Sequence, residues 1–358
     1  FAASFHPRLR FADPTPDEPI EVKRNYPCYY DELYGDTPGR DVLYFGASKT
    51  HHAVDAPLIE AFHAAVTGED LRAFAFDTPN SNPEIVYFMF RDYLENNPAP
   101  RRAFFELTSV FPLQPPIRYI HPLFADLAPP YLYLDVLQPS SLVKHRLFAV
   151  SDFLQLLIRH IDLSLSRLLI ADVRFIVPPG DNCGAPERSP VPALDAAWQY
   201  TYAQLLDVEM SRHASTLEPG TIGERVALLE AYADDPYTSA YISRWDEPRR
   251  ARFEKDFWRG GKRLKKRSLH YYRQIVALGE QHGVDIEFYF LADVHSPEPT
   301  EEAIRRTAGL LGAPVHTLPY EHVLVSYHFY KDAAHVTPAM RPAFAIWFAS
   351  LLGRGETR

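Results

Sequence analysis

Three residues that are far apart in the sequence carry the side chains that nucleophilic catalysis requires. Ser48 follows a short apolar segment, and Asp332 and His335 stand three residues apart much later in the chain. A serine hydroxyl becomes a nucleophile when an imidazole about 3 Å away accepts its proton, and a carboxylate can orient that imidazole. Each residue alone is more typical of a turn, a helix cap or a surface position. The combination predicts a serine nucleophile if the fold brings the two stretches together.

The elements around Ser48 predict how it is positioned. Apolar strands are expected at 41–45, 72–76 and 102–107, with helices at 55–66 and 83–95 between them. The first of these helices has a possible aspartate cap at its start and apolar residues at helical spacing. Strands that alternate with helices in this way are typical of a parallel sheet.

The same alternation returns towards the end of the chain. A strand is expected at 284–291, a helix through 311 that Thr300 caps and Gly312 stops, and a last strand at 314–318. Thr337-Pro338 is expected to open a final helix. Its core-facing stripe would be Met340, Phe344, Trp347, Phe348, Leu351 and Leu352.

These elements predict an α/β fold, namely a doubly wound, flavodoxin-like parallel sheet of about five strands with helices on both faces. Residues 1–40 are rich in Pro, Asp and Glu and have no period, so we expect an extended N-terminal arm. Residues 41–358 would form a single domain that is interrupted by a mainly helical insertion at about 112–282. The basic run at 259–273 is either a solvated helix face or a contact for an anionic polymer or lipid headgroup.

Composition excludes several classes of function. Acidic residues outnumber basic ones, 46 to 37, which argues against a nucleic-acid partner. No apolar run reaches the ~18 residues of a membrane span. The sequence has no Walker loop, GxGxxG or HExxH motif, so we expect no cofactor and no metal. The two cysteines, Cys28 and Cys183, could form one disulfide or remain separate thiols.

In an open parallel sheet, ligands bind at the carboxyl ends of the strands where the strand order reverses. Ser48 would stand at this crevice, close to backbone N–H groups that could stabilise an oxyanion. Gly46 would permit a tight turn before it. His51 could line the crevice mouth and contact substrate, or face solvent at the entry to a helix.

Two blocks of the chain resemble the SGNH (GDSL-type) serine hydrolases. The block 41–48, with Asp55 shortly after it, resembles the first block of that family, in which Gly-Asp precedes the serine. Ala47 replaces this aspartate, as in the branch that includes alginate-type O-acetyltransferases. The segment 330–338 resembles the last block, an Asp-x-x-His before the final helix. The resemblance covers roughly residues 40–110 and 284–352.

The resemblance implies roles for individual residues. Ser48 would be the nucleophile, His335 the general base and Asp332 the carboxylate that orients it. For the oxyanion hole, Asn80 would occupy the place of the glycine of the second block. Thr108 would replace the asparagine of the third block, with Asn182 as a more distant alternative. A lost oxyanion donor typically lowers the rate about 10²–10³-fold.

Two functions therefore stand as hypotheses. The first is an O-acetyltransferase or acetyl esterase that acts on a cell-surface or secreted polysaccharide through an acyl-Ser48 intermediate. The resemblance implies a carbohydrate or acyl-ester substrate and an extracytoplasmic (periplasmic or secreted) location. A membrane-bound acyl-donor protein would be a partner, and an anchor could precede Phe1. The second is a weak or inactive SGNH-fold protein that binds glycan or a partner within a polysaccharide-modifying assembly.

Overall fold

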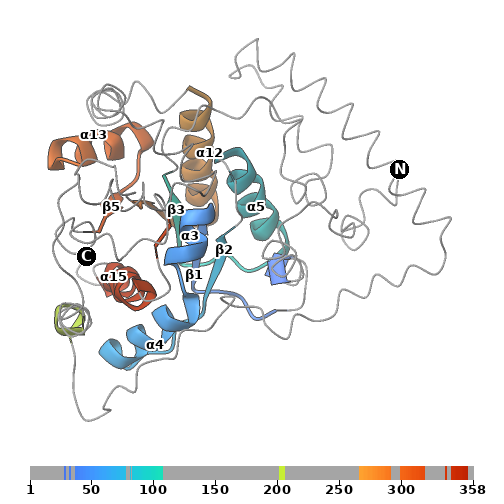
Figure 1. The fold of residues 1–358 in the computed structure, drawn as a ribbon. Coiled ribbons are helices and arrows are strands. Elements are labelled where there is room, and N and C mark those ends of the chain that lie inside the picture. The colour runs from blue at the N-terminus through green and yellow to red at the C-terminus, as the bar shows by residue number, and fades with distance from the viewer. Residues whose placement is uncertain are drawn as a thin grey trace, which may run out of the picture. The chain divides into compact units, whose positions relative to one another are not determined.

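The fold is seen in a computed structural model of the 358-residue chain (Figure 1). The residues that the structure describes form several segments separated by gaps. These segments are 28–29, 32–33, 37–77, 81, 83–107, 201–205, 266–291, 299–318, 335–336 and 340–353.

The described strands form a parallel sheet of five strands in the order β2-β1-β3-β4-β5. Their bounds are Val42–Gly46 (β1), Ala73–Asp77 (β2), Arg102–Glu106 (β3), Asp285–Phe290 (β4) and Val315–Thr317 (β5). This order and the parallel pairing confirm the predicted doubly wound α/β fold. The strand order reverses between β1 and β3, so the carboxyl ends of these two strands mark the expected position of a ligand crevice.

Six helices are described between and beside these strands, and the cap residues that the sequence predicted are in place. Their bounds are Ser48–Ala53 (α3), Ala56–Thr67 (α4), Pro83–Asn96 (α5), Lys266–His282 (α12), Glu301–Leu311 (α13) and Arg341–Gly353 (α15). Asp55 caps α4 by accepting the N–H of Leu58, and Thr300 caps α13 by accepting the N–H of Ala303. Gly312 ends α13 in the left-handed conformation, with φ of 81°.

Helices cover both faces of the sheet, because successive side chains of each strand point to opposite sides. On one face, the Phe348 ring of α15 makes edge contacts with Tyr44 of β1 and Tyr289 of β4, each at 5.1 Å between centroids. On the other face, Tyr272 of α12 lies 5.2 Å from Phe288 of β4. In Figure 1, α4 and α15 lie side by side, as their mutual contacts require.

The final helix is more deeply buried than its predicted apolar stripe suggests. Eleven of the 13 residues of α15 are buried, on nearly every side, including the five predicted core residues within the helix. Met340, the sixth, is buried just before the helix begins. Arg102 donates through Nη1 to the carbonyl oxygens of Leu351 and Leu352 at 3.0 and 3.1 Å. A cation there satisfies carbonyls that the last turn of a helix leaves without partners.

The chain divides into two compact units. The sheet and the helices α3, α4, α12, α13 and α15 belong to one unit, and most of α5 belongs to the other. Within the latter, Asn97 donates to the carbonyl of Leu33, and Cys28 is buried and disulfide-bonded. Cys183, the predicted strand at 173–177 and most of the predicted arm and insertion lie outside the described residues. The predicted domain boundaries stay a prediction.

No helix within the described segments is both long and apolar enough to cross a membrane.

Gly46, the last residue of β1, is needed for space. Its φ is not in the left-handed region, which the glycines at 68, 283 and 312 occupy. A Cβ atom on Gly46 would overlap the Thr50 side chain, lying 2.6 Å from its Cβ, and would lie 2.7 Å from Glu106 Oε2. The sequence suggested a tight turn at this position, whereas the structure gives close packing as the reason for a glycine.

We therefore expect Gly46→Ala to lower the free energy of unfolding by about 1–3 kcal/mol, because the added methyl group displaces Thr50 and Glu106. Gly309 in α13 is the matched control, since a Cβ there meets nothing within 4 Å. Gly309→Ala should raise the same quantity by roughly 0.5–1 kcal/mol through helix propensity. Urea unfolding monitored by circular dichroism measures both. Equal effects of the two substitutions would contradict the packing argument.

Candidate functional site

The fold brings Ser48 and His335 together, although 287 positions separate them in the sequence. Ser48 is the first residue of α3, one residue beyond the end of β1. His335 lies five residues before Met340, at the approach to α15, and is 9% exposed. Its Nε2 atom is 2.9 Å from Ser48 Oγ. When the serine donates in this hydrogen bond, Nε2 is unprotonated and Nδ1 carries the ring proton.

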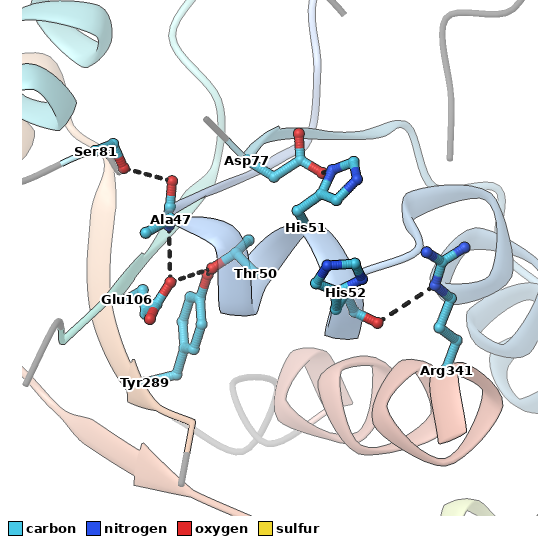
Figure 2. Close-up of polar contacts among 10 residues, drawn as sticks. Ala47, Thr50, His51, His52, Asp77, Ser81, Glu106, Tyr289 and Arg341 are labelled. Atoms are coloured by element: carbon cyan, nitrogen blue, oxygen red, sulfur yellow. Dashed lines mark hydrogen bonds and ion pairs between the residues drawn. The ribbon is translucent and has the colours of Figure 1, made fainter. Parts of the chain in front are cut away.

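A second histidine packs against this imidazole. The His52 ring, near the end of α3, makes an edge contact with the His335 ring at 4.8 Å between centroids. The carbonyl of His52 accepts a hydrogen bond from Arg341 Nε at 3.3 Å (Figure 2). Because Arg341 is the first residue of α15, this bond joins the end of α3 to the start of the last helix. Both helices that flank the Ser48–His335 contact are thereby held together.

Behind Ser48, a buried carboxylate binds the turn between β1 and α3. Glu106 Oε2 accepts the backbone N–H of Ala47 at 2.8 Å and the hydroxyl of Thr50 at 2.6 Å (Figure 2). Tyr289 Oη lies 2.7 Å from Thr50 Oγ1 and 3.1 Å from the carbonyl oxygen of Phe45. Thr50 donates its hydroxyl proton to Glu106, so Thr50 Oγ1 can only accept from Tyr289. The single phenolic proton of Tyr289 is therefore shared between two acceptors, Thr50 Oγ1 and the Phe45 carbonyl.

Two further contacts surround the same turn. His51 is 4% exposed, and its Nδ1 lies 2.9 Å from Asp77 Oδ2 at the end of β2. Ser81 donates its hydroxyl to the carbonyl of Gly46 at 2.7 Å. The structure thus gives His51 a contact within the protein at the carboxyl end of β2. A role for His51 in contacting substrate stays a prediction.

The tyrosines of this face are held in their neutral form. Burial raises the pKa of Tyr289 well above its usual value, and the charge of Glu106 raises it further. Burial also raises the pKa of Tyr44, with the charge of Glu287 acting in the same direction. Both phenols therefore serve as neutral polar groups at physiological pH. They differ in hydrogen bonding, because the Tyr44 hydroxyl has no partner among the described residues.

The other residues that the sequence singled out lie outside the described residues. They are Asp332, Asn80, Thr108 and the more distant candidate Asn182. The predicted roles of Asp332 in orienting His335, and of Asn80 and Thr108 in the oxyanion hole, stay predictions. Gly46 lies one residue before Ala47, with its carbonyl bound to Ser81.

Sequence reasoning missed the polar cluster behind the serine. The sequence pattern includes Glu106 only as part of the expected strand at 102–107, and it assigns no role to Thr50 or Tyr289. A signal was present, because a carboxylate that ends an apolar strand beside the strand of the serine must find hydrogen-bond donors when it is buried. The donors themselves could not be identified without the register of β1 and β3.

Within the described segments, no group of three or more His, Cys, Asp or Glu side chains could hold a metal ion. Lys49, the residue after the serine, donates through Nζ to the carbonyl of Leu291 at 3.0 Å. This bond attaches the first turn of α3 to the residue that follows β4. The arrangement around Ser48 can therefore supply a hydroxyl, an imidazole and hydrogen-bond donors.

Comparisons with known proteins assign the chain to no family. No protein-family model matches it, and a search of curated protein sequences finds none that is similar.

The two tyrosines allow a matched test of the polar cluster. Tyr289→Phe should lower the free energy of unfolding by about 0.5–1.5 kcal/mol, because it removes the hydroxyl that contacts Thr50 and the carbonyl of Phe45. Tyr44→Phe should be neutral or stabilising, since it removes a buried hydroxyl that has no partner among the described residues. Urea unfolding of the two variants decides this. A larger loss for Tyr44→Phe would contradict the hydrogen-bond assignment.

Stability should also fall at alkaline pH. A phenol whose pKa is raised in the folded state keeps its proton there, while the unfolded chain releases it above about pH 10. The unfolded state then binds fewer protons, so the free energy of unfolding decreases as pH rises. Each such group contributes up to about 1.4 kcal/mol per pH unit. Tyr44→Phe should make the decline between pH 10 and 11.5 shallower in denaturant titrations, and superimposable slopes would refute this.

Proposed function

We propose that the protein is a serine-dependent acyl enzyme, an acetyl esterase or O-acetyltransferase, in which Ser48 is the nucleophile and His335 the general base. The observation that carries the proposal is the 2.9 Å contact between Ser48 Oγ and His335 Nε2. A heavy-atom distance within about 2.6–3.2 Å is the geometry in which an imidazole can accept a hydroxyl proton. The position of the pair, at the carboxyl end of β1 where the strand order reverses, also supports it.

In the first half of the reaction, Ser48 Oγ attacks the carbonyl carbon of an ester and transfers its proton to His335 Nε2. The tetrahedral intermediate collapses, the bond between the carbonyl carbon and the alcohol oxygen breaks, and the imidazolium returns the proton to the departing alcohol. The acyl group is then bound to Ser48 as an ester. These are the roles that a serine and a histidine have in acyl transfer generally.

In the second half, a hydroxyl compound attacks the acyl-enzyme while His335 accepts its proton. Water as the acceptor gives a free acid, and a sugar hydroxyl gives an acylated sugar. In both cases the bond between the acyl carbon and Ser48 Oγ breaks, and the proton on His335 returns to the serine. Hydrolysis and transfer therefore use the same residues and differ only in which acceptor occupies the site.

The oxyanion of the tetrahedral intermediate needs N–H donors near Ser48. The Ala47 N–H is already bound to Glu106. The Ser48 N–H is the next donor along the chain, because the first N–H groups of a helix have no acceptor within it. In this proposal the Ser48 N–H contributes to the oxyanion hole. Asn80 and Thr108 remain the further candidates from the sequence.

We also propose that the chain is a diverged SGNH-type enzyme, with a cell-surface or secreted polysaccharide as its acyl acceptor or substrate. The support is the pair of sequence blocks that contain Ser48 and His335, together with the contact between these two residues. An extracytoplasmic location and a membrane-bound acyl-donor partner belong to the same proposal. They follow from the resemblance alone.

Labelling by a fluorophosphonate tests the nucleophile directly. The purified protein should form a covalent adduct in which Ser48 Oγ binds phosphorus and fluoride leaves, and mass spectrometry of peptides locates it. Ser48→Ala should abolish the adduct and the hydrolysis of p-nitrophenyl acetate above the rate without enzyme. Ser350→Ala is the matched control, because that hydroxyl donates to the Trp347 carbonyl within its own helix. It should leave both activities unchanged.

An unlabelled Ser48 in a protein with intact circular dichroism would overturn the enzymatic proposal. Glycan binding by the same unlabelled protein would then favour the second hypothesis, a binding protein on this fold. Labelling that persists in Ser48→Ala would assign the reactivity to another residue.

A further inference from the structure

Glu106 lies at the carboxyl end of β3, and its side chain contacts residues on both sides of Ser48. It is the last residue of β3, which pairs with β1 where the strand order reverses. Its carboxylate is buried, with the residue 6% exposed. One oxygen, Oε2, accepts the N–H of Ala47, immediately before the serine, and the hydroxyl of Thr50, two residues after it.

The residues around Glu106 leave space for its carboxylate and supply hydrogen-bond donors to it. Gly46 has no side chain, and a Cβ there would lie 2.7 Å from Glu106 Oε2. Thr50 is fully buried, and its hydroxyl also lies 2.7 Å from Tyr289 Oη. A buried carboxylate is costly unless donors compensate for its lost water, and bonds to an ionised acceptor are the stronger kind. The two donors therefore bind Glu106 firmly and are themselves held in place.

We propose that Glu106 is a positioning residue that fixes the turn between β1 and α3, so that the Ser48 hydroxyl faces His335. This inference rests on the proposed function and adds a residue to it. Holding Ala47 and Thr50 from one atom restrains the backbone on both sides of the serine. The same bond turns the Ala47 N–H towards Glu106 and makes it unavailable as an oxyanion donor.

The effect expected from losing this restraint is on rate. Misplacing a reacting group by about 1 Å can lower a rate roughly 10²-fold. Glu106→Met keeps an unbranched side chain but removes both acceptor oxygens, so the turn loses its anchor. Glu106→Gln keeps one carbonyl oxygen that can accept from Ala47 and Thr50. The glutamine variant should therefore retain much of the activity that the methionine variant loses.

Glu60 provides a matched control for the loss of a carboxylate. Its Oε1 accepts the N–H of Ala73 at 2.7 Å, at the start of β2 and hence at the end of the sheet away from Ser48. Glu60→Met removes the same kind of carboxylate-to-backbone bond in the same compact unit. It should lower stability and leave the reactivity of each folded molecule unchanged.

The experiment measures the second-order rate constant of fluorophosphonate labelling at Ser48, with kcat and KM for p-nitrophenyl acetate, corrected for the folded fraction. Glu106→Met should label roughly 10²-fold more slowly than the parent, with the loss in kcat, while Glu106→Gln stays within about tenfold of the parent and Glu60→Met matches it. Labelling of Glu106→Met at the parental rate would overturn the positioning role. Equal losses of labelling rate in Glu106→Met and Glu60→Met would also overturn it, because the loss would then be a general effect of losing a carboxylate.

Two further measurements keep the result decisive. If Glu106→Met does not fold, Thr50→Val takes its place, because it removes one of the two donors to Glu106. This variant should label about tenfold more slowly, which corresponds to about 1.4 kcal/mol in activation free energy. An unchanged rate would count against the inference. A crystal structure of the folded Glu106 variant should show Ser48 Oγ displaced from His335 Nε2. An undisplaced serine overturns the positioning role whether or not the parent has activity. Failure of the parent to label Ser48, by contrast, overturns the proposed function.

Discussion

The hydrogen bonds that Glu106 Oε2 accepts from Ala47 and Thr50 link the end of β3 to the turn that follows β1. A carboxylate at this depth requires donors, and among the described residues Ala47 and Thr50, on either side of Ser48, donate to Oε2. The space for it exists because Gly46 has no side chain. The buried carboxylate of Glu106 thus needs hydrogen bonds, and the bonds that it makes link β3 to the end of β1 and the start of α3.

The position of His335 depends on a different part of the core. The last helix is buried on nearly every side, and its Phe348 ring packs against Tyr44 and Tyr289 of the sheet. Arg341 at its start is bonded to the carbonyl of His52, whose ring contacts His335. Tyr289 therefore touches both sides of the arrangement, with its ring against α15 and its hydroxyl against Thr50. The positions of the Ser48 hydroxyl and the His335 ring therefore depend on the same packed residues.

Much of the fold could be predicted from the sequence because the strands are short apolar runs between polar turns. The caps of α4 and α13 were also predictable, since Asp55, Thr300 and Gly312 are residue types with a local preference for those positions. The helix α3 was not predicted, because its six residues, SKTHHA, carry no apolar period. Its formation depends on the contacts of Thr50 and His51 with residues at the ends of β3 and β2.

The candidate site was predictable in part for the same physical reason. Parallel strands bring their carboxyl ends to one edge, so Ser48 could be assigned to that edge from the strand pattern alone. The partners of Ser48 depend on register, on the depth of α15 and on which carboxylates are already bound. Asp77 and Glu106 both stand at this edge, and both are engaged by α3, through His51 and Thr50. Since Nε2 of His335 faces the serine, an orienting carboxylate would have to approach its Nδ1 from the other side of the ring. Asp332, three residues earlier in the same stretch of chain, remains the candidate for that position.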